Sequence, residues 1–284
     1  GFFGRSNINF KNKYLLTLSY RRDGSSRFEK ESRWGNFPSA AFAWKVKEDF
    51  FKDSNVVSDL KLRLSYGITG QQDIPDPNGY LEKYDLGGGN SQYQFGNAYF
   101  PIALPSKRTK NLKWEETVSY NAGLDFGVFN NVITGAVDVF YKEAKDLLVN
   151  AAISDGSNFS NRVYQNVGSF TTKGIEFTLN ASPIKTENFN WNINFNASKF
   201  ERRIKDLVYG TDIYVGDNIA GTGTQGQIFR EGYTPYSFYV YKQLYDTNGK
   251  AIEGAFADLN GDNIKNDSDR YIYNNPDPDV TLGF

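Results

Sequence analysis

The chain has 284 residues, with 32 Lys and Arg against 33 Asp and Glu, so its formal charge is −1 and it offers no strongly basic face for a nucleic-acid partner. It contains no Cys, His or Met, which excludes disulfides, thiolate nucleophiles, imidazole bases and metal sites built on Cys or His. No stretch approaches ~20 consecutive apolar residues, so no transmembrane helix is expected, although aromatic residues make up 16% of the chain.

Apolar and polar residues alternate with a period of two along much of the chain. The alternation is clearest from Val118 to Val128, where every even position is apolar, and from Phe189 to Ser198, where Asn or Ser separates the apolar residues. Because successive side chains of a strand point to opposite faces, each such stretch has one apolar and one polar face. In chain order, the pattern predicts about eight long strands, at 2–10, 14–23, 36–47, 58–69, 116–128, 132–149, 167–182 and 189–203.

The connections between these strands alternate in length. Short links lie at 11–13, 130–131 and 184–188, with a modest one at 48–57, whereas long links lie at 24–35, 70–111, 150–166 and from 204 onward. Short turns at one end and long loops at the other are typical of an outer-membrane β-barrel. Aromatic residues near the strand ends would suit two interfacial girdles. On the short-turn side they are Tyr14, Trp44, Phe126, Phe129, Phe189 and Trp191, and on the long-loop side Tyr20, Tyr66, Trp114 and Tyr141.

The alternative is a soluble or cell-surface β-sandwich, for example an adhesin, or a solenoid that buries the same apolar faces inward. Strand length, alternating loop length and aromatic content together favour the membrane barrel. The two architectures differ in one respect that a structure can test. In the barrel, the apolar faces at Val118–Val128 and Phe189–Ala197 contact lipid, so no other part of the chain covers them.

Seven stretches, in order along the chain, resemble the SusC/RagA-type TonB-dependent outer-membrane transporters of Bacteroidota. They are Tyr14–Phe28, Trp34–Trp44, Leu60–Gln71, Leu112–Asp125, Val139–Leu148, Asn166–Phe177 and Asp258–Arg270. The resemblance implies an all-β fold, an antiparallel transmembrane barrel of about 22 strands, of which this chain supplies eight or nine. It also implies import of large nutrients, oligosaccharide or peptide, through the cell outer membrane.

The resemblance further implies three partners: outer-membrane lipid, a SusD-like lipoprotein that covers the extracellular mouth, and TonB, which contacts a region absent from this sequence. The plug domain is absent as well, and the chain starts without Met, so we expect an internal piece of a longer polypeptide. We expect barrel strands with extracellular loops at 1–203, an extracellular region with a hairpin at Ser237–Tyr245 within 204–279, and the start of another strand at 280–284. An alternative role is that of a structural subunit in a larger outer-membrane assembly.

The segment Asp258–Asp269 matches the spacing of a twelve-residue calcium loop, with oxygen ligands at positions 1, 3, 5, 9 and 12 and a backbone carbonyl at position 7. The predicted structural Ca²⁺ site consists of Asp258, Asn260, Asp262, the carbonyl of Ile264, Asn266 and Asp269. Two positions depart from the pattern, since Asn263 replaces Gly at position 6 and Asp269 replaces the longer Glu at position 12. The alternative is a solvated turn that its own side-chain-to-backbone hydrogen bonds hold together.

No enzyme is expected, because the adjacent carboxylates Glu115 and Glu116 point to opposite faces of a strand and no other catalytic arrangement is present. Six charged residues fall on the predicted lumen face, where they either contact cargo or pair with one another: Lys61, Arg63, Asp125, Asp138, Lys142 and Glu176. Five loop aromatics either stack on sugar rings, contact the lid protein or pack within their loop: Tyr80, Tyr84, Tyr93, Tyr99 and Phe100.

Overall fold

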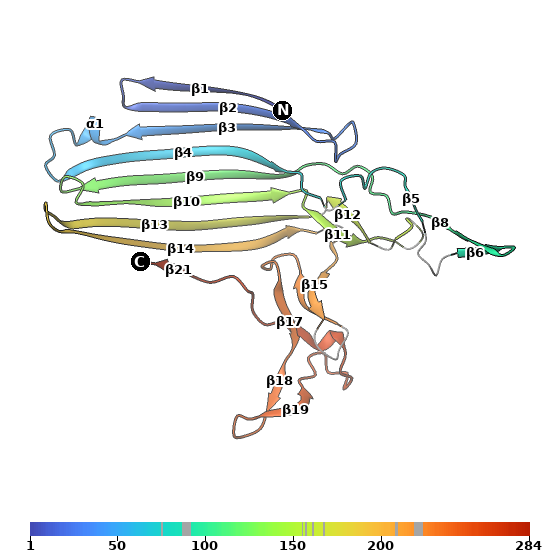
Figure 1. The fold of residues 1–284 in the computed structure, drawn as a ribbon. Coiled ribbons are helices and arrows are strands. Elements are labelled where there is room, and N and C mark those ends of the chain that lie inside the picture. Colours follow the sequence, from blue (N-terminus) through green and yellow to red (C-terminus); the bar gives the residue numbers. More distant parts are fainter. Residues whose placement is uncertain are drawn as a thin grey trace.

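The computed structural model describes residues 1–74, 76–86, 92–154, 156, 158–160, 162–166, 168–207, 210–218 and 224–284. Its main element is a nine-stranded antiparallel sheet with the strand order β1-β2-β3-β4-β9-β10-β13-β14-β21 (Figure 1). The strands are β1 Phe2–Phe10, β2 Tyr14–Gly24, β3 Trp34–Lys45, β4 Val57–Gln71, β9 Glu115–Val128, β10 Ile133–Lys145, β13 Ser169–Lys185, β14 Asn190–Asp206 and β21 Thr281–Gly283. This open sheet confirms the predicted all-β architecture. In the described part of the chain, no helix has both the length and the apolar character needed to cross a bilayer.

Each of the eight predicted strands corresponds to a strand of this sheet, and the differences lie at strand ends. Strand β3 ends at Lys45, before the expected residue 47, because the chain turns into the short helix α1 (Lys47–Phe50). Strand β10 ends at Lys145, because Asp146 adopts a left-handed conformation with φ 57° that breaks the extended backbone. The following residues form a separate hairpin from β11 (Leu148–Ala152) and β12 (Arg162–Asn166).

The register brings apolar side chains of neighbouring strands together on one face of the sheet. One row that crosses six strands consists of Leu16, Phe42, Leu64, Ala122, Val139 and Ile175. This face is open: Leu64 is 45% exposed, Tyr120 51% and Trp191 50%. The described residues therefore do not bury the faces at Val118–Val128 and Phe189–Ala197, and the predicted sandwich alternative is wrong.

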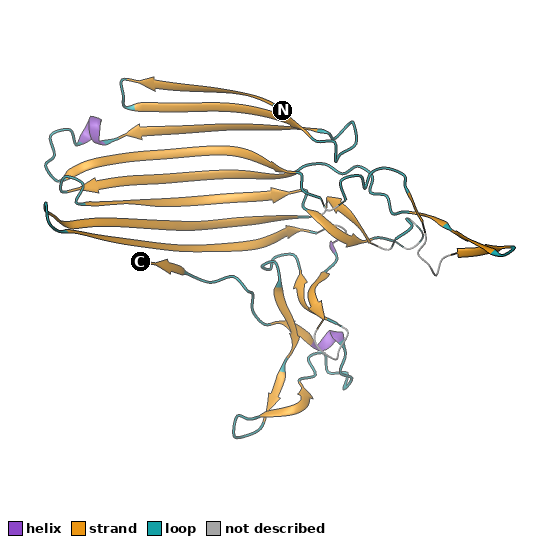
Figure 2. Cartoon of the chain, in the orientation of Figure 1, coloured by secondary structure: helices purple, strands orange, loops and turns teal. Residues whose placement is uncertain are grey.

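The short connections lie at one end of the sheet and the long ones at the other (Figure 2). The tightest turn places Lys11 at φ 54° and Asn12 at φ 56°, and the N–H of Lys13 donates to the carbonyl of Phe10 at 3.1 Å. Two successive positive φ values give the turn the twist that matches a hairpin of two right-twisted strands. Asn130 and Asn131 are also left-handed in the turn between β9 and β10.

At the long-loop end, an apolar cluster joins segments that are far apart in the sequence. It consists of Phe28, Phe37, Ile74, Leu112 and Trp114. Trp114 is only 7% exposed, and its ring centroid lies 5.4 Å from that of Phe28 and 5.3 Å from that of Phe37. The prediction that Trp114 belongs to an interfacial girdle is therefore wrong, because loop residues bury it. The long loops also form two small hairpins, β5 (Tyr84–Leu86) with β8 (Ala103–Pro105) and β6 (Gln92–Phe95) with β7 (Ala98–Pro101).

The region between β14 and β21 forms a separate small β-module beside the sheet (Figure 1). Four of its strands form one sheet: β15 (Ile213–Asn218), β16 (Gln225–Phe229), β17 (Ser237–Tyr241) and β20 (Arg270–Ile272). Strands β18 (Gln243–Tyr245) and β19 (Ala251–Phe256) form a hairpin, and the 3₁₀ helix η2 (Asp267–Asp269) precedes β20. The hairpin expected at Ser237–Tyr245 differs in detail, since β17 ends at Tyr241 and β18 pairs with another strand.

Candidate functional site

Charged side chains on the polar face of the sheet form a continuous ionic network. Lys61 Nζ lies 2.7 Å from Asp125 on the neighbouring strand, and Arg63 lies 2.7 Å from the same carboxylate. Arg63 also reaches Asp138, one strand further, at 2.8 Å. The network therefore links β4, β9 and β10, and mutual pairing is the arrangement that these four predicted lumen residues adopt.

The remaining two predicted lumen residues stand outside this network. Among the described residues, neither Lys142 nor Glu176 has an ion-pair partner within 4.0 Å, and Lys142 Nζ lies 5.0 Å from the centroid of the Phe140 ring. Lys142 and Glu176 are therefore two charges of this face that remain available for contacts with a solute.

Gly123 on β9 allows the side chain of Arg63 on β4 to reach Asp138 on β10. It lies in the register position between the two partners, opposite Arg63 on one side and Asp138 on the other. A Cβ atom at this position would lie 2.6 Å from Nη2 of Arg63 and would also collide with the Asp138 carboxylate. The missing side chain is thus what allows an ion pair to bridge two strands that are not neighbours.

Small polar side chains also lie on this face and pair across the strands. Ser19 and Ser39 lie 2.6 Å apart, and Ser182 donates to Asn192 at 2.7 Å. Side-chain groups satisfied in this way, together with the ionic network, make a surface that water wets. The opposite face is apolar in its middle rows, for example from Leu16 to Ile175, so the sheet is amphipathic.

Aromatic residues mark both ends of the apolar face. At the long-loop end, Tyr66, Tyr120 and Tyr141 stand side by side on three neighbouring strands, with ring centroids 5.2 and 6.4 Å apart. At the short-turn end, Tyr14 and Trp44 are paired across β2 and β3 with centroids 6.2 Å apart. These positions agree with the two expected girdles.

The side chain of Asp49, next to the short turns, binds the polar groups of the aromatic residues at the short-turn end. It forms an ion pair with Lys13 and accepts hydrogen bonds of 2.9 Å from both the Trp44 indole and the Tyr14 hydroxyl. The hydrogen bond from Lys13, followed by those from Trp44 and Tyr14, lowers the pKa of Asp49 from its usual 3.8 to about 2. The carboxylate therefore stays ionised and fixes the orientation of both aromatic rings.

A polar cleft separates the long loop 76–114 from the β11–β12 hairpin at the other end of the sheet. Two asparagine side chains of this region pair with the loop backbone as a neighbouring strand would. Asn158 accepts from the N–H and donates to the carbonyl of Arg108, at 3.2 and 2.6 Å, and Asn166 does the same with Lys113 at 2.9 and 2.8 Å. The cleft has a volume of about 820 Å³, and Tyr84 on its wall is 71% exposed.

The predicted loop aromatics show both exposure and self-packing. Tyr99 is 64% exposed, whereas the rings of Tyr93 and Phe100 stack across the β6–β7 hairpin with centroids 5.6 Å apart. Even in this pair Tyr93 keeps 53% of its surface exposed. Self-packing therefore holds the hairpin while leaving aromatic surface free for a ligand or a partner.

The segment Asp258–Asp269 is a compact turn in which side-chain oxygens accept backbone N–H groups. Asp258 accepts from Gly261 at 2.6 Å and from Asn263 at 2.7 Å, and Asp262 accepts from Ile264 at 2.7 Å. Asn263, at position 6 of the loop, has φ 58°, the left-handed conformation that the Gly of the calcium-loop pattern would supply.

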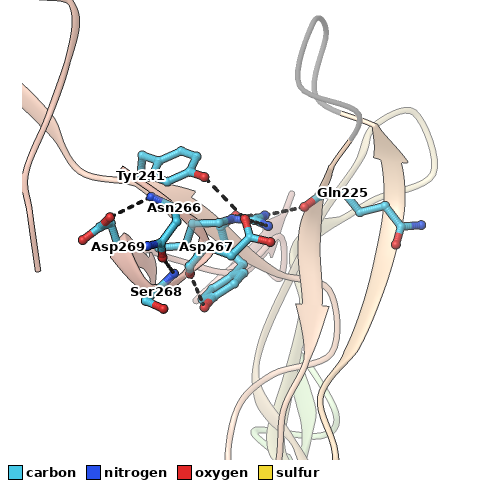
Figure 3. Close-up of polar contacts among 8 residues, drawn as sticks. Gln225, Tyr241, Asn266, Asp267, Ser268 and Asp269 are labelled. Carbon is cyan, nitrogen blue, oxygen red and sulfur yellow. Dashed lines mark hydrogen bonds and ion pairs between the residues drawn. The ribbon is translucent and has the colours of Figure 1, made fainter. Parts of the chain in front are cut away.

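The buried carboxylate of Asp269 accepts backbone N–H groups from both ends of this turn (Figure 3). It is 1% exposed, and its two oxygens accept from the N–H groups of Leu259 at 2.9 Å and Asn266 at 3.0 Å. These backbone donors, first that of Asn266 and then that of Leu259, lower the pKa of the Asp269 carboxyl. Asn266 in turn caps η2 by accepting from the N–H of Ser268 at 2.8 Å.

The predicted ligands are hard oxygen donors, and that chemistry fits Ca²⁺. Within the described ranges, however, no three acidic side chains gather in a position to hold a metal ion. The self-bonded turn that we considered as the alternative describes the observed geometry, and oxygens that accept one hydrogen bond retain a lone pair for a cation. Calcium binding at Asp258, Asn260, Asp262, Ile264, Asn266 and Asp269 stays a prediction.

Arg270, which follows directly after this loop, is the important residue that the sequence pattern alone did not single out. It is 5% exposed, donates to the carbonyls of Tyr239 and Gln225, and lies 3.5 Å from Asp267. Its guanidinium also stands 4.4 Å from the ring centroid of Tyr239. An arginine in an otherwise acidic motif was the available signal, because a buried guanidinium needs several acceptors at once.

Comparison with known proteins gives a consistent result. A family model described as TonB dependent receptor-like, beta-barrel, matches residues 1–281. The chain is 47% identical to TonB-dependent receptor SusC of Bacteroides thetaiotaomicron, over 99% of the chain and 29% of that protein. It is 35% identical to TonB-dependent receptor P3 of Formosa agariphila, again over 99% of the chain and 29% of that protein.

Solved structures share the fold. The structure of the RagAB peptide transporter superposes with a TM-score of 0.79 and 23% sequence identity, and the match covers 99% of this chain and 30% of that one. The RagAB peptide importer in its open-open state matches with a TM-score of 0.78 and 24% identity. The chain thus spans less than a third of the length of the relatives that it matches.

Proposed function

Since the chain belongs to the TonB-dependent receptor-like β-barrel family and is of the SusC/RagA type, we propose that it forms wall and extracellular parts of a nutrient importer in the outer membrane. The cargo is a large nutrient, an oligosaccharide or a peptide. The observation that carries the proposal is the two-faced sheet: an uncovered apolar face between two aromatic rows, backed by a hydrophilic face that a solute can pass.

The sheet suits this role for a simple physical reason. Hydrocarbon cannot satisfy backbone N–H and C=O groups, so a lipid-facing wall must pair them between strands, as the nine antiparallel strands do. On the other face, the network around Arg63 balances two positive charges with two carboxylates, which weakens the field in the middle of this polar surface. Such a surface lets a neutral or weakly charged nutrient pass without trapping it.

The long-loop end supplies the surfaces for recognition. We propose that the exposed aromatic rings near Tyr84 and Tyr99 contact cargo or a SusD-like surface lipoprotein, and that the module between β14 and β21 belongs to the same extracellular side. Aromatic faces bury large area for few rotatable bonds, which suits both sugar stacking and a protein interface. TonB would supply energy through a part of the protein outside this chain.

Uptake by cells tests the proposal directly. A strain that lacks the gene should lose energy-dependent accumulation of one labelled oligosaccharide or peptide pool, and the full-length gene should restore it only while TonB is functional. The protein should leave membranes only with detergent and should co-purify with a surface lipoprotein. Release from membranes in high salt without detergent, or accumulation that is independent of TonB, would overturn the proposal.

We also propose that the loop Asp258–Asp269 binds one Ca²⁺ ion as a structural element. The support is its oxygen-only donor set with the ligand spacing of a calcium loop, together with the left-handed Asn263. In that role Asp258, Asn260, Asp262, Asn266 and Asp269 would supply side-chain oxygens and Ile264 its carbonyl. A calcium ion would rigidify the module and would take no part in moving cargo.

A further inference from the structure

Cations gather on the outward, apolar face of the sheet, immediately beyond the tyrosine row. In the register, Tyr66, Tyr120 and Tyr141 are followed in the same row by Lys173 and Glu201. The next row toward the middle of the sheet is apolar from Leu16 to Ile175 and ends at Lys199. A lysine at the end of an apolar row needs a physical explanation.

The outward-facing basic patch is defined by its five cations and the four carboxylates among them. The cations are Lys145, Lys173, Lys199, Arg203 and Lys205, and the carboxylates are Glu116, Glu143, Glu201 and Asp206. Glu143 serves two lysines, with Lys205 at 2.7 Å and Lys145 at 3.4 Å. The patch therefore keeps a positive surplus after its internal pairs are made.

The cations of this patch are accessible. The side chain of Lys173 is 67% exposed although it lies 3.1 Å from Glu201, and that of Arg203 is 57% exposed. Lys199 is exposed and, among the residues that the structure describes, has no carboxylate within 4.0 Å. The module next to β14 accepts one hydrogen bond from Arg203, at the carbonyl of Gly232 at 2.7 Å, whereas Lys173 and Lys199 stay exposed to whatever surrounds the sheet.

We propose that this outward-facing basic patch binds the phosphate groups of lipid headgroups in the leaflet at the long-loop end. This inference rests on the proposed outer-membrane function. A lysine on a lipid-facing row is tolerated near the membrane interface, where its stem lies along the apolar surface and its ammonium reaches the headgroups. A phosphate there completes the charge balance of the patch with charge-assisted hydrogen bonds, and the adjacent tyrosines fix the depth at which it sits.

The test uses the full-length protein in detergent and native mass spectrometry with a doubly phosphorylated lipid A as the probe. Removal of two charges in the double variant Lys173→Gln/Lys199→Gln should weaken binding roughly 25-fold at low salt, because each basic residue near an anionic surface contributes about five-fold. The charge-retaining variant Lys173→Arg/Lys199→Arg should bind like wild type. The control Lys11→Gln, which removes a cation beside Phe10 at the opposite end of the sheet, should stay within about two-fold of wild type.

Three results would overturn the inference. Equal binding of lipid A and its dephosphorylated form would show that acyl chains alone are recognised. Unchanged binding by the double Gln variant would remove the patch from the interaction. Displacement of the lipid by millimolar inorganic phosphate would assign the patch to a free anion. The heat-dependent gel mobility of the folded barrel controls for misfolding, and the uptake assay on wild type decides the proposed function separately.

Discussion

A charge placed in the middle of the apolar face gives the sharpest test of whether this face contacts lipid. Leu124 stands four residues from Tyr120 and four from Val128, which is about 14 Å along the strand in each direction. With a strand tilt of about 40°, that places Leu124 near the centre of an apolar band about 25 Å tall. Leu124→Arg should therefore lower the free energy of unfolding in phospholipid vesicles by about 2–4 kcal/mol.

The matched control lies on the same strand and the opposite face. Asn121→Arg puts the same guanidinium on the polar side and should change the free energy of unfolding by less than about 1 kcal/mol. Urea titration of the full-length protein in vesicles measures both. If Leu124→Arg stays within about 0.5 kcal/mol of wild type, as expected for an exposed leucine in water, the assignment of this face to lipid is wrong.

Three further outcomes are expected. Gly123→Ala should separate Arg63 from the Asp138 carboxylate and lower the free energy of unfolding by about 1–3 kcal/mol. The control Gly4→Ala, whose added Cβ meets nothing within 4 Å, should leave this free energy unchanged. Equal effects of the two substitutions would contradict the role of Gly123 in the Arg63–Asp138 ion pair. The pKa of Asp49 in the folded protein is depressed to about 2, so its contribution to stability is complete above its usual pKa of 3.8 and is lost as the pH falls through 2. The difference in urea midpoint between wild type and Asp49→Asn should therefore be constant from pH 7 to about 4 and should shrink below pH 4. If calcium binds the Asp/Asn loop, chelator should speed proteolysis of that loop in wild type but have no effect in Asp258→Ala, while Asp246→Ala, which alters a different turn, should still respond.

The alternation of residue types predicted the strands closely, because a strand with one apolar and one polar face must alternate apolar and polar residues along its length. The places where prediction failed depend on long-range packing. Trp114 stands at the expected end of its strand, yet Phe28 and Ile74, from two other loops, bury it. Likewise, residues 237–245 alternate like one strand, but β17 and β18 pair with different partners.

The contacts within the charged network also could not be predicted from the sequence alone. The period of two placed Arg63, Asp125 and Asp138 on one face, but it could not say which side chains meet. Contact between Arg63 and Asp138 requires both the register of three strands and the absence of a side chain at Gly123. For the loop at Asp258–Asp269, the spacing alone fitted two interpretations, and it could not show the hydrogen bonds of the turn, because these involve backbone groups that no residue pattern encodes.

The strict two-sidedness of the strands constrains how such a protein can change over time. Loss or gain of one residue inside β9 would send every later side chain of that strand to the other side, putting Asp125 on the apolar face and Leu124 on the polar face. Insertions and deletions are therefore tolerated only where the chain leaves the sheet, and the tight turns at one end accept few of them. Sequence diversification would then proceed through the long loops, with the sheet inherited almost unaltered.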